Sequence, residues 1–380
     1  MQRGLTYSKG DEVPFSSKRV LRSNNIDLES SKLDLTELKY LRDDFVIPED
    51  KKVKKNSIFI CMSNGSKQHV GKVAFIDENI DYAFGGFMGL IAPQDGVTPK
   101  YVFYSCLSPA YRLFLSSISN GIGITNLRFT DLANFTLPVP PIQEQEKIVA
   151  ELDCLSGIIE KKKQQLAELD KLAQSIFYDM FGDPIINEKG WDVKKLGDVC
   201  ETITDGTHFS PKSYETGEYK YITAKNIKKD GFDFKGLTYL PKEIHKEIYS
   251  RCSPVYGDVL FIKDGATTGI AMINTLYEEF SLLSSVALLR GGKFINNRYL
   301  RDYLNFPSTY KVVRDDMGGA AITRLTLKKI ARIRIVVPPL DLQTAFAAKI
   351  EFIEHQKDLI MKSIAETETL FNSRMDYWFN

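Results

Sequence analysis

Two polar loops carry side chains whose hydrogen-bonding groups suit the recognition of nucleic-acid bases. The first loop, residues 63–69, reads SNGSKQH, and the second, residues 263–268, reads KDGATT. Asparagine and glutamine amides can pair with adenine, lysine can pair with guanine, and a threonine methyl can contact thymine. A solvated loop is the ordinary interpretation of any one such residue. Because both loops follow similar short apolar runs, their recurrence favours a binding role.

Further polar positions recur at matching places in the two halves of the chain. Residues 22–25 match residues 225–226, residues 126–128 match residue 324, and residues 207–208 form another polar turn. The predicted base-contacting residues are therefore Arg22, Asn24, Asn25, Ser63, Asn64, Lys67, Gln68, His69, Lys72, Asn126, Arg128, Thr207, His208, Lys225, Asn226, Lys263, Thr267, Thr268 and Arg324.

Catalytic motifs are scarce in this sequence. The segment GSKQHVGKV at residues 65–73 departs from a phosphate-binding loop, because it has one residue too many between the glycines and Val73 replaces the magnesium-holding hydroxyl. The sequence has no HExxH, no GxSxG, and no Asn-Pro-Pro-aromatic motif of the kind that amino-methyltransferases use. Its four histidines lack metal-ligand spacing. We therefore predict a binding protein with no catalytic residue, no metal site and no cofactor of its own.

The charge balance lowers the expected affinity for nucleic acid through overall charge alone. The 380 residues include 50 Lys+Arg and 49 Asp+Glu, which gives a formal net charge of +1. Proteins that bind nucleic acid through overall charge are usually far more basic. A local basic cleft offset by acidic faces elsewhere still fits this balance.

Cysteine usage and hydropathy indicate the compartment. The five cysteines are widely separated and form no CxxC pair, so neither a disulfide framework nor a zinc site is expected. No apolar run approaches the roughly 18 residues of a membrane helix, and the first residues, MQRGLTYSKGDEV, lack the apolar core of a signal peptide. We expect a cytoplasmic protein without a membrane segment.

Two long helices are predicted to position the polar loops. The segment Leu137–Asp183 opens on a double proline and has an apolar 4,3 repeat from Ile148 to Met180. This repeat predicts one helix, Ile142–Phe181, with a coiled-coil seam. Sliding the sequence by 198 residues places Pro140 on Pro338 and supplies the partner helix from Val336–Asn380. The predicted coiled-coil interface consists of Ile148, Leu152, Leu155, Ile159, Leu166, Phe346, Ile350, Ile353, Ile360 and Ile364.

The same repeat predicts that the chain is two copies of one unit. The register holds without insertion from Gly71 through Phe181, and upstream the offset drifts to 201 or 202. The two seams differ, because Ile159 lies over Lys357 while Lys162 lies over Ile360. This exchange indicates that the two helices are fitted to each other.

Each copy is predicted to be a mixed globular part followed by a long helix. The expected elements are strands at 57–62, 72–76, 134–139, 258–262, 270–273 and 332–337, and helices at 101–117 and 297–313. The predicted class is α+β, with a first domain at 1–139, a central helix at 140–183, a second domain at 184–337 and a C-terminal helix at 338–380. The second copy opens on Trp191–Cys200, whose counterpart in the first would precede Met1, so the first domain is predicted to be N-terminally shortened.

This arrangement resembles the specificity subunits of type I restriction–modification systems. The resemblance rests on LPVPPIQEQEKIVAELD, IVVPPLDLQTAFAAKIE, ITNL at 124–127, ITRL at 322–325 and WDVKKLGD at 191–198, and it spans essentially the whole chain. It implies two target-recognition domains that read one bipartite site in double-stranded DNA, with the base-contacting residues named above as DNA-binding residues. It also implies an antiparallel coiled coil, two methylation subunits as partners, and restriction subunits that join them. S-adenosylmethionine, ATP and magnesium would belong to those partners.

Helix length offers an independent reason for two separated readers. A helix from Ile142 to Phe181 would be about 60 Å long at 1.5 Å per residue, which exceeds one DNA turn of roughly 34 Å. The alternative that the sequence leaves open is a coiled-coil structural adaptor that binds only protein.

Overall fold

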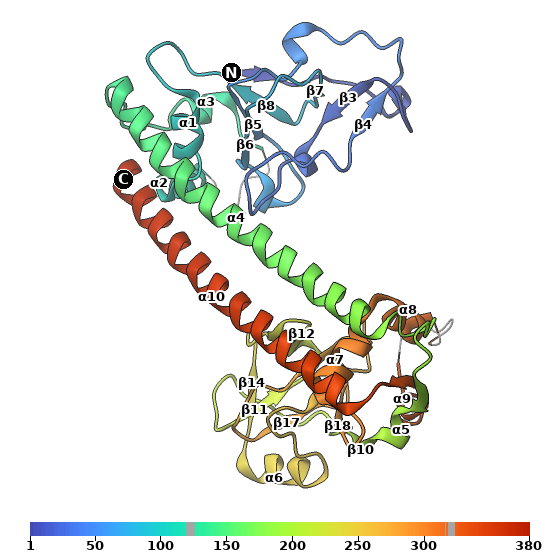
Figure 1. Ribbon diagram of the computed structural model, residues 1–380. Helices are drawn as coiled ribbons and strands as arrows, with labels where there is room; N and C mark the ends of the chain where they lie inside the picture. Colours follow the sequence, from blue (N-terminus) through green and yellow to red (C-terminus); the bar gives the residue numbers. More distant parts are fainter. Residues whose placement is uncertain (119–125, 316, 318–323) are drawn as a thin grey trace. The chain divides into compact units, whose positions relative to one another are not determined.

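The computed structural model describes residues 1–118, 126–315, 317 and 324–380 (Figure 1). The chain forms two compact units. Unit 1 contains Met1–Lys163 and Met361–Asn380, and unit 2 contains Gln164–Ile360. The long helices α4 (Ile142–Phe181) and α10 (Leu340–Phe379) each contribute one part to each unit.

Unit 1 is built on two four-stranded sheets. The central strand β5 (Ser57–Cys61) is buried at every position. Its side chains alternate between two cores, with Ile58 in one and Phe59 in the other, as the two-residue period of a strand requires. The sheets run in the order β1 (Gln2–Arg3), β8 (Met88–Ile91), β5, β6 (Val73–Ile76), and β2 (Glu12–Val13), β4 (Lys39–Leu41), β3 (Lys18–Leu21), β7 (Ala83–Phe84).

Short helices complete unit 1. The α-helices are α1 (Pro99–Ser105), α2 (Pro109–Ile118) and α3 (Phe129–Leu132), and the 3-10 turns are η1 (Lys9–Asp11), η2 (Ser23–Asn25), η3 (Glu49–Lys51) and η4 (Lys67–His69).

Unit 2 repeats this plan with additions. Its larger sheet has the order β10 (Cys200–Asp205), β18 (Val286–Gly291), β15 (Val259–Ile262), β16 (Ala271–Ile273), and matches the β1-β8-β5-β6 sheet of unit 1. The second sheet has the order β14 (Thr238–Leu240), β11 (Tyr219–Ile222), β17 (Phe280–Leu282), with β11 and β17 parallel as β3 and β7 are. Two further pairs are β12 (Ile227–Lys228) with β13 (Gly231–Phe232), and β9 (Asp192–Lys195) with β19 (Arg334–Val337).

Two helices of unit 2 have no counterpart among the described residues of unit 1. They are α5 (Leu196–Val199), which precedes β10, and α6 (Lys242–Arg251), which occupies the sequence position where unit 1 has only the turn η3. The other elements are α7 (Asn297–Asn305), α8 (Pro307–Asp315), α9 (Leu327–Arg332) and the 3-10 turn η5 (Ala224–Asn226).

Three sequence expectations are corrected by the structure. The helices expected at 101–117 and 297–313 are each divided into two, because Pro109 and Pro307 begin new helices. Residues 134–139 form no strand among the described residues. The equivalent strand β19 pairs with β9, whereas residues 134–139 pair with no strand among the residues that the structure describes. A strand without a pairing neighbour leaves its backbone groups unbonded.

The two long helices pack together in each unit around aromatic side chains. In unit 2, Phe181 near the end of α4 lies 5.2 Å from Phe346 near the start of α10, between ring centroids, and 4.8 Å from Tyr299 of α7. In unit 1, the corresponding ring at the end of α10, Phe379, lies 5.1 Å from Tyr101 of α1. The end of one helix therefore fills the core formed by the start of the other helix and its globular part.

Candidate nucleic-acid interface

The polar segments predicted to contact bases lie together in unit 1. Ser63, just after β5, forms a bridge with Asn126. The Asn64 side-chain amide donates a hydrogen bond of 2.7 Å to the Ser23 hydroxyl. These two contacts join residues 22–25, 63–69 and 126–128 into one polar surface at the carboxyl end of β5.

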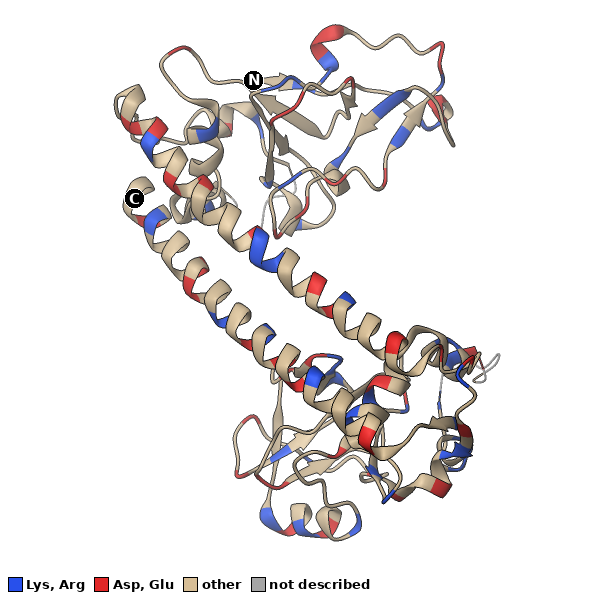
Figure 2. Ribbon diagram, in the orientation of Figure 1, with Lys and Arg blue, Asp and Glu red and all other residues tan. Residues whose placement is uncertain are grey.

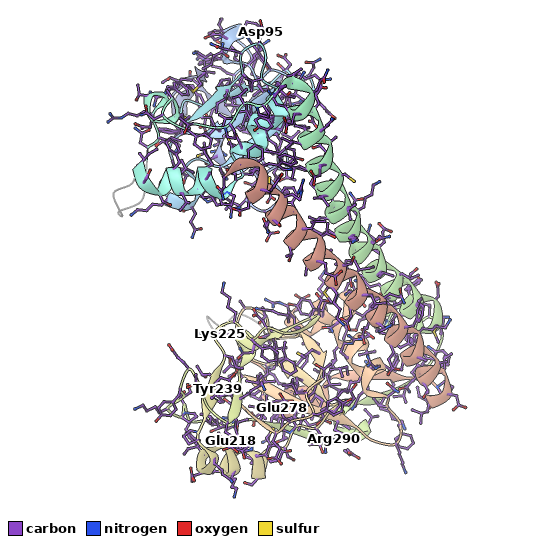
Figure 3. All side chains as sticks on the ribbon, turned by 90° about the vertical axis from the view of Figure 1, so that its left-hand side faces the viewer. Asp95, Glu218, Lys225, Tyr239, Glu278 and Arg290 are labelled. Carbon is purple, nitrogen blue, oxygen red and sulfur yellow. The ribbon has the colours of Figure 1, made fainter. Side chains whose placement is uncertain are left out.

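The equivalent segments converge in unit 2 through residues 283–285. The Lys263 backbone N–H donates to the carbonyl oxygen of Ser285 at 2.9 Å, and the Ala224 N–H donates to the Ser285 hydroxyl at 3.2 Å. Thr207 accepts from the Ser284 N–H at 2.8 Å. Asp264 forms a bridge with Arg324, which is the same junction that Ser63 makes in unit 1. Figure 3 places Lys225 of this surface toward a different end of unit 2 from Glu218 and Arg290.

Exposure divides the predicted contact residues into three groups. The exposed side chains belong to Asn24, Lys67, Gln68, Asn126, Arg128, His208, Lys225, Thr267 and Arg324. The half-buried ones belong to Arg22, Ser63, Asn64, His69 and Lys72. Asn25, Thr207, Asn226, Lys263 and Thr268 are buried.

The two buried asparagines hold their loops in place. The Asn25 carbonyl oxygen accepts from the Arg22 N–H at 2.8 Å, and its amide donates to the carbonyl oxygens of Asp34 and Glu37. Asn226 accepts in the same way from the Thr223 N–H and donates to the Asp233 carbonyl. Their amides are committed to backbone groups, which corrects the expectation that they pair with bases.

The buried Thr268 and Lys263 require the same correction. The Thr268 hydroxyl donates to the Gly265 carbonyl at 2.7 Å inside its own loop. The Lys263 ammonium lies 3.3 Å from a carboxylate oxygen of the buried Asp205. A long side chain with its charge paired in the interior cannot present that charge to a ligand. Thr207 is also buried, and its backbone carries the contact to Ser284.

Burial lowers the pKa of two basic residues among the predicted DNA contacts of unit 1. The Lys72 ammonium donates to the carbonyl of Ile26 at 2.8 Å, and burial lowers the pKa of this lysine. Burial, together with the nearby Lys72 charge, also lowers the pKa of His69. His69 is therefore a neutral hydrogen-bonding group near pH 7, and Lys72 acts as an anchor for the 22–26 segment.

The predicted seam residues of the long helices are all buried or half-buried. This holds for Ile148, Leu152, Leu155, Ile159, Leu166, Phe346, Ile350, Ile353, Ile360 and Ile364.

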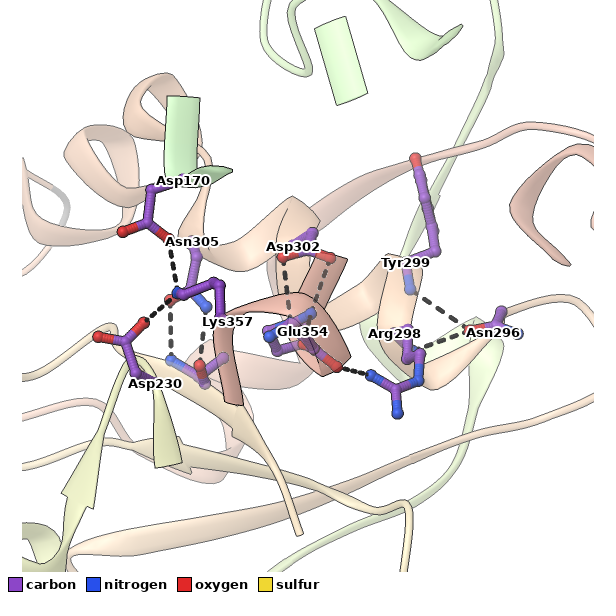
Figure 4. Close-up of polar contacts among 11 residues, drawn as sticks. Asp170, Asp230, Asn296, Arg298, Tyr299, Asp302, Asn305, Glu354 and Lys357 are labelled. Carbon is purple, nitrogen blue, oxygen red and sulfur yellow. Dashed lines mark hydrogen bonds and ion pairs between the residues drawn. The ribbon is translucent and has the colours of Figure 1, made fainter. Parts of the chain in front are cut away.

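The two lysines of the seam find polar partners on the facing helix. Lys162 donates to the Ser363 hydroxyl at 2.5 Å in unit 1. Lys357 lies 2.7 Å from Asp170 of α4 and 3.4 Å from Asp230 after β12 in unit 2 (Figure 4). The two lysines occupy different positions of the repeat, and each has polar partners of its own. This agrees with the sequence, in which each lysine is replaced by isoleucine in the other copy.

Sequence reasoning missed two buried glutamines at the starts of the long helices. Gln145 and Gln343 are both fully buried and bond the helix start to the preceding loop. They stand 198 positions apart, so the repeat itself contained the signal. A polar residue that recurs in register within an apolar stripe is a candidate for a buried hydrogen-bonding role.

Neither a metal site nor a membrane helix is found in the part of the chain that the structure describes. No group of three or more His, Cys, Asp or Glu side chains there could hold a metal ion. None of the helices described is both long and apolar enough to cross a membrane. The ribbon in Figure 2 shows Lys and Arg residues interspersed with Asp and Glu residues along α4 and α10.

Comparison with curated proteins finds specificity subunits of type I restriction enzymes. The chain is 25% identical over 328 residues to the type I restriction enzyme MjaIX specificity subunit of Methanocaldococcus jannaschii, covering 79% of this chain and 74% of that protein. It is 23% identical over 386 residues to the type I restriction enzyme EcoKI specificity subunit of Escherichia coli K12, covering 95% of this chain and 81% of that protein.

Solved structures show the same fold. The type I restriction–modification S subunit from M. genitalium aligns over 100% of this chain and 93% of its own, with a TM-score of 0.58 and 14% identity. The prediction of an α+β fold with paired long helices is confirmed.

A profile of the type I restriction modification DNA specificity domain matches residues 10–171 and again residues 188–369. The duplicate match confirms the two-copy organisation, and the family assigns the chain to DNA recognition rather than to catalysis or protein-only scaffolding. The chain belongs to the type I restriction modification DNA specificity domain family.

Proposed function

We propose that each unit reads one half of a bipartite DNA target through the polar surface at the carboxyl end of one central strand, β5 in unit 1 and β15 in unit 2. The observation that carries this proposal is the junction shared by the two copies, Ser63 with Asn126 and Asp264 with Arg324. Both junctions join the loop after the central strand to the residue that precedes a buried leucine, Leu127 or Leu325. Two copies of one reading surface in one chain fit two half-sites.

Within each surface, exposed and buried residues have different tasks. The exposed side chains are the proposed contacts to base edges and phosphates. Examples are Gln68 and Arg128 in unit 1 and Lys225 and Arg324 in unit 2. The buried Asn25 and Asn226 shape the loops that present them. Rigid support of this kind matters because a contact displaced by about 1 Å loses most of its discrimination.

The chain would then act as one component of a larger complex. We propose two methylation subunits as partners, one for each copy, together with restriction subunits. The exposed Leu172 and Leu370 support two equivalent docking sites, one on each unit, because they stand 198 positions apart and are 47% and 50% exposed. S-adenosylmethionine, ATP and magnesium would be bound by those partners, and the complex would act in the cytoplasm.

Mapping methylated bases in the host genome, with this gene intact and deleted, tests the proposal. The expected result is a bipartite motif, with two short specified sequences separated by a fixed number of unspecified bases, that disappears on deletion. The two methylated positions should lie one in each half. A contiguous motif, or a bipartite motif that survives the deletion, would contradict the proposal.

A further inference from the structure

A buried ion-pair network lies beneath the reading surface of unit 2. Its centre is Asp205, the last residue of β10, whose side chain is only 2% exposed. Three side chains converge on this carboxylate: the Lys263 ammonium at 3.3 Å, the Arg251 guanidinium at 3.0 Å and the His208 imidazole at 3.2 Å. A buried carboxylate with several cationic donors is held in one orientation.

The network extends from Lys263 to the loop residue Asp264 and to Arg324. The Lys263 ammonium lies 3.6 Å from Asp264, and Asp264 lies 3.4 Å from the exposed Arg324. The centre is therefore buried, while the three ends Arg251, His208 and Arg324 are about half exposed. Three permanent cations face two carboxylates, so the network has an excess positive charge even with His208 neutral.

The fold itself does not require a lysine at position 263. Leu325 donates its N–H to the Lys263 carbonyl at 2.8 Å, and in the first copy Leu127 donates to the carbonyl of Met62 at 2.7 Å. Met62 therefore occupies the equivalent position and is buried without any charge. Burying an ammonium costs free energy unless it is paired. Because an uncharged side chain fills the equivalent position of unit 1, the Lys263–Asp205 pair points to a role other than packing.

We infer that Arg251 is a further DNA-contacting residue of unit 2, and that the buried Lys263–Asp205 pair is the device that positions it. The inference rests on the proposed function. Arg251 ends α6, and its guanidinium gives one N–H to Asp205 while its side chain stays 54% exposed. A guanidinium has five donors in a rigid planar fork, so the others remain available for a guanine edge or a phosphate.

The role of Lys263 follows from the charges. An isolated carboxylate beside the reading surface would repel the DNA backbone and would attract the Arg251 guanidinium inward. Because the Lys263 ammonium pairs with Asp205 from the interior, the carboxylate can orient Arg251 and His208 without presenting an uncompensated negative charge. Arg251 contacts DNA, whereas Asp205 and Lys263 are positioning residues.

Sequence comparison between the copies could not find Arg251. It lies on α6, which has no counterpart in unit 1, and Asp205 joins it to residues 207–208 and 263 only in three dimensions.

The test measures equilibrium binding of the chain, in complex with its methylation subunits, to duplexes that carry the genomic methylation motif and to duplexes with single-base changes in each half-site. Arg251→Ala should lose roughly tenfold or more in discrimination at one or two positions of one half-site, and should lower the salt dependence of binding by about one counterion. Discrimination in the other half-site should be unchanged. Lys220→Ala is the matched control, because Lys220 is also paired with a carboxylate, Glu278, on the surface of unit 2; it should bind as wild type does.

A double-mutant cycle tests the positioning pair. Lys263→Met copies the residue of the first unit and leaves Asp205 without its interior partner, so discrimination should fall in the same half-site as for Arg251→Ala. Asp205→Asn combined with Lys263→Met removes both buried charges and should restore the thermal unfolding midpoint, while discrimination stays low because Arg251 has lost its anchor. Recovery of discrimination together with stability would overturn the positioning role.

The remaining outcomes separate the two levels of the proposal. Unchanged binding by a folded Arg251→Ala variant would overturn the assignment of Arg251 as a contact. A wild-type complex that binds the methylated motif no better than random DNA would instead contradict the proposed function itself.

Discussion

Gln145 and Gln343 make the same three hydrogen bonds at positions that all differ by 198. Gln145 accepts from the Thr98 N–H at 2.8 Å and donates to the carbonyls of Gly96 and Pro140 at 3.1 and 2.8 Å. Gln343 accepts from the Asn296 N–H at 2.9 Å and donates to the carbonyls of Phe294 and Pro338 at 3.0 and 2.8 Å. Each glutamine thus fixes the entry of a long helix to the loop before a short helix.

Replacing either glutamine by leucine should destabilise its own unit. Gln145→Leu leaves the half-buried Thr98 N–H and Pro140 carbonyl without their side-chain partner, and an unsatisfied buried group costs about 1–3 kcal/mol. Denaturant unfolding should show the loss. The control Gln164→Leu, at an exposed position of the same helix, should change the unfolding free energy by less than about 0.5 kcal/mol. Equal effects of the two substitutions would contradict the anchoring role.

The seam of the long helices predicts a contrast between two leucines of α4. Leu152 is fully buried against the core of unit 1, whereas Leu172 is about half exposed. Leu152→Ala should cost about 2–5 kcal/mol through lost contacts and a residual cavity. Leu172→Ala should cost less than about 1 kcal/mol. The unfolding free energies of the two variants measure the difference, and a larger loss at Leu172 would be inconsistent with the packing described.

Two glycines predict opposite effects of an added methyl group. A Cβ at Gly206 would lie 1.8 Å from the carbonyl oxygen of Leu282, and one at Gly4 would lie 2.0 Å from that of Gly85, so both copies need glycine where two strands meet closely. Gly206→Ala should therefore destabilise unit 2 strongly. Gly157 lies inside α4 with open space around it, and Gly157→Ala should stabilise the protein by about 0.5–1 kcal/mol. Thermal unfolding of both variants would show the signs.

Acid should weaken the contact between the two helices in unit 1. The hydrogen bond from Arg374, together with one from Trp378, holds the pKa of Glu151 below its usual value. A carboxyl whose folded pKa is depressed stabilises the protein above its unfolded pKa of about 4.3, and this contribution is lost as pH falls through the folded value.

The stability difference between wild type and Glu151→Gln should accordingly be present at pH 7 and shrink between roughly pH 5 and pH 3. Denaturant midpoints measured across this range test it. A difference that stays constant with pH would show that Glu151 contributes through packing alone.

The repeat predicted much of the fold, because the two copies align without insertions or deletions over the segment that ends in each long helix. The offset of 198 holds from Gly71 through the long helices, and the structure has its two long helices, α4 and α10, in the two segments that this repeat relates. Residues 134–139 resemble β19 in sequence but pair with no strand among the described residues, whereas β19 pairs with β9, so the local pattern did not determine the structure. Strand formation depends on a neighbour that the pattern does not contain.

The reading surface was harder to predict, because exposure is a tertiary property. Lys263 sits in a polar loop and reads as a ligand contact, yet it aligns in space with Met62, at an offset of 201 rather than 198. Asn25 and Asn226 were matched correctly as equivalents, but their shared task is to bond backbone groups. Recurrence in both copies identified residues that matter without showing whether they face solvent.

The central claim is that each unit reads its own half-site. The decisive measurement is the base preference of the assembled complex at every position of the target, for a unit 1 variant with Gln68→Ala and Arg128→Ala and for a unit 2 variant with Lys225→Ala and Arg324→Ala, all at exposed positions. We predict that each variant loses discrimination, by about 1–3 kcal/mol at each affected position, in one half-site only, and that the two variants affect opposite halves. Loss of discrimination in both halves by either variant would contradict the account.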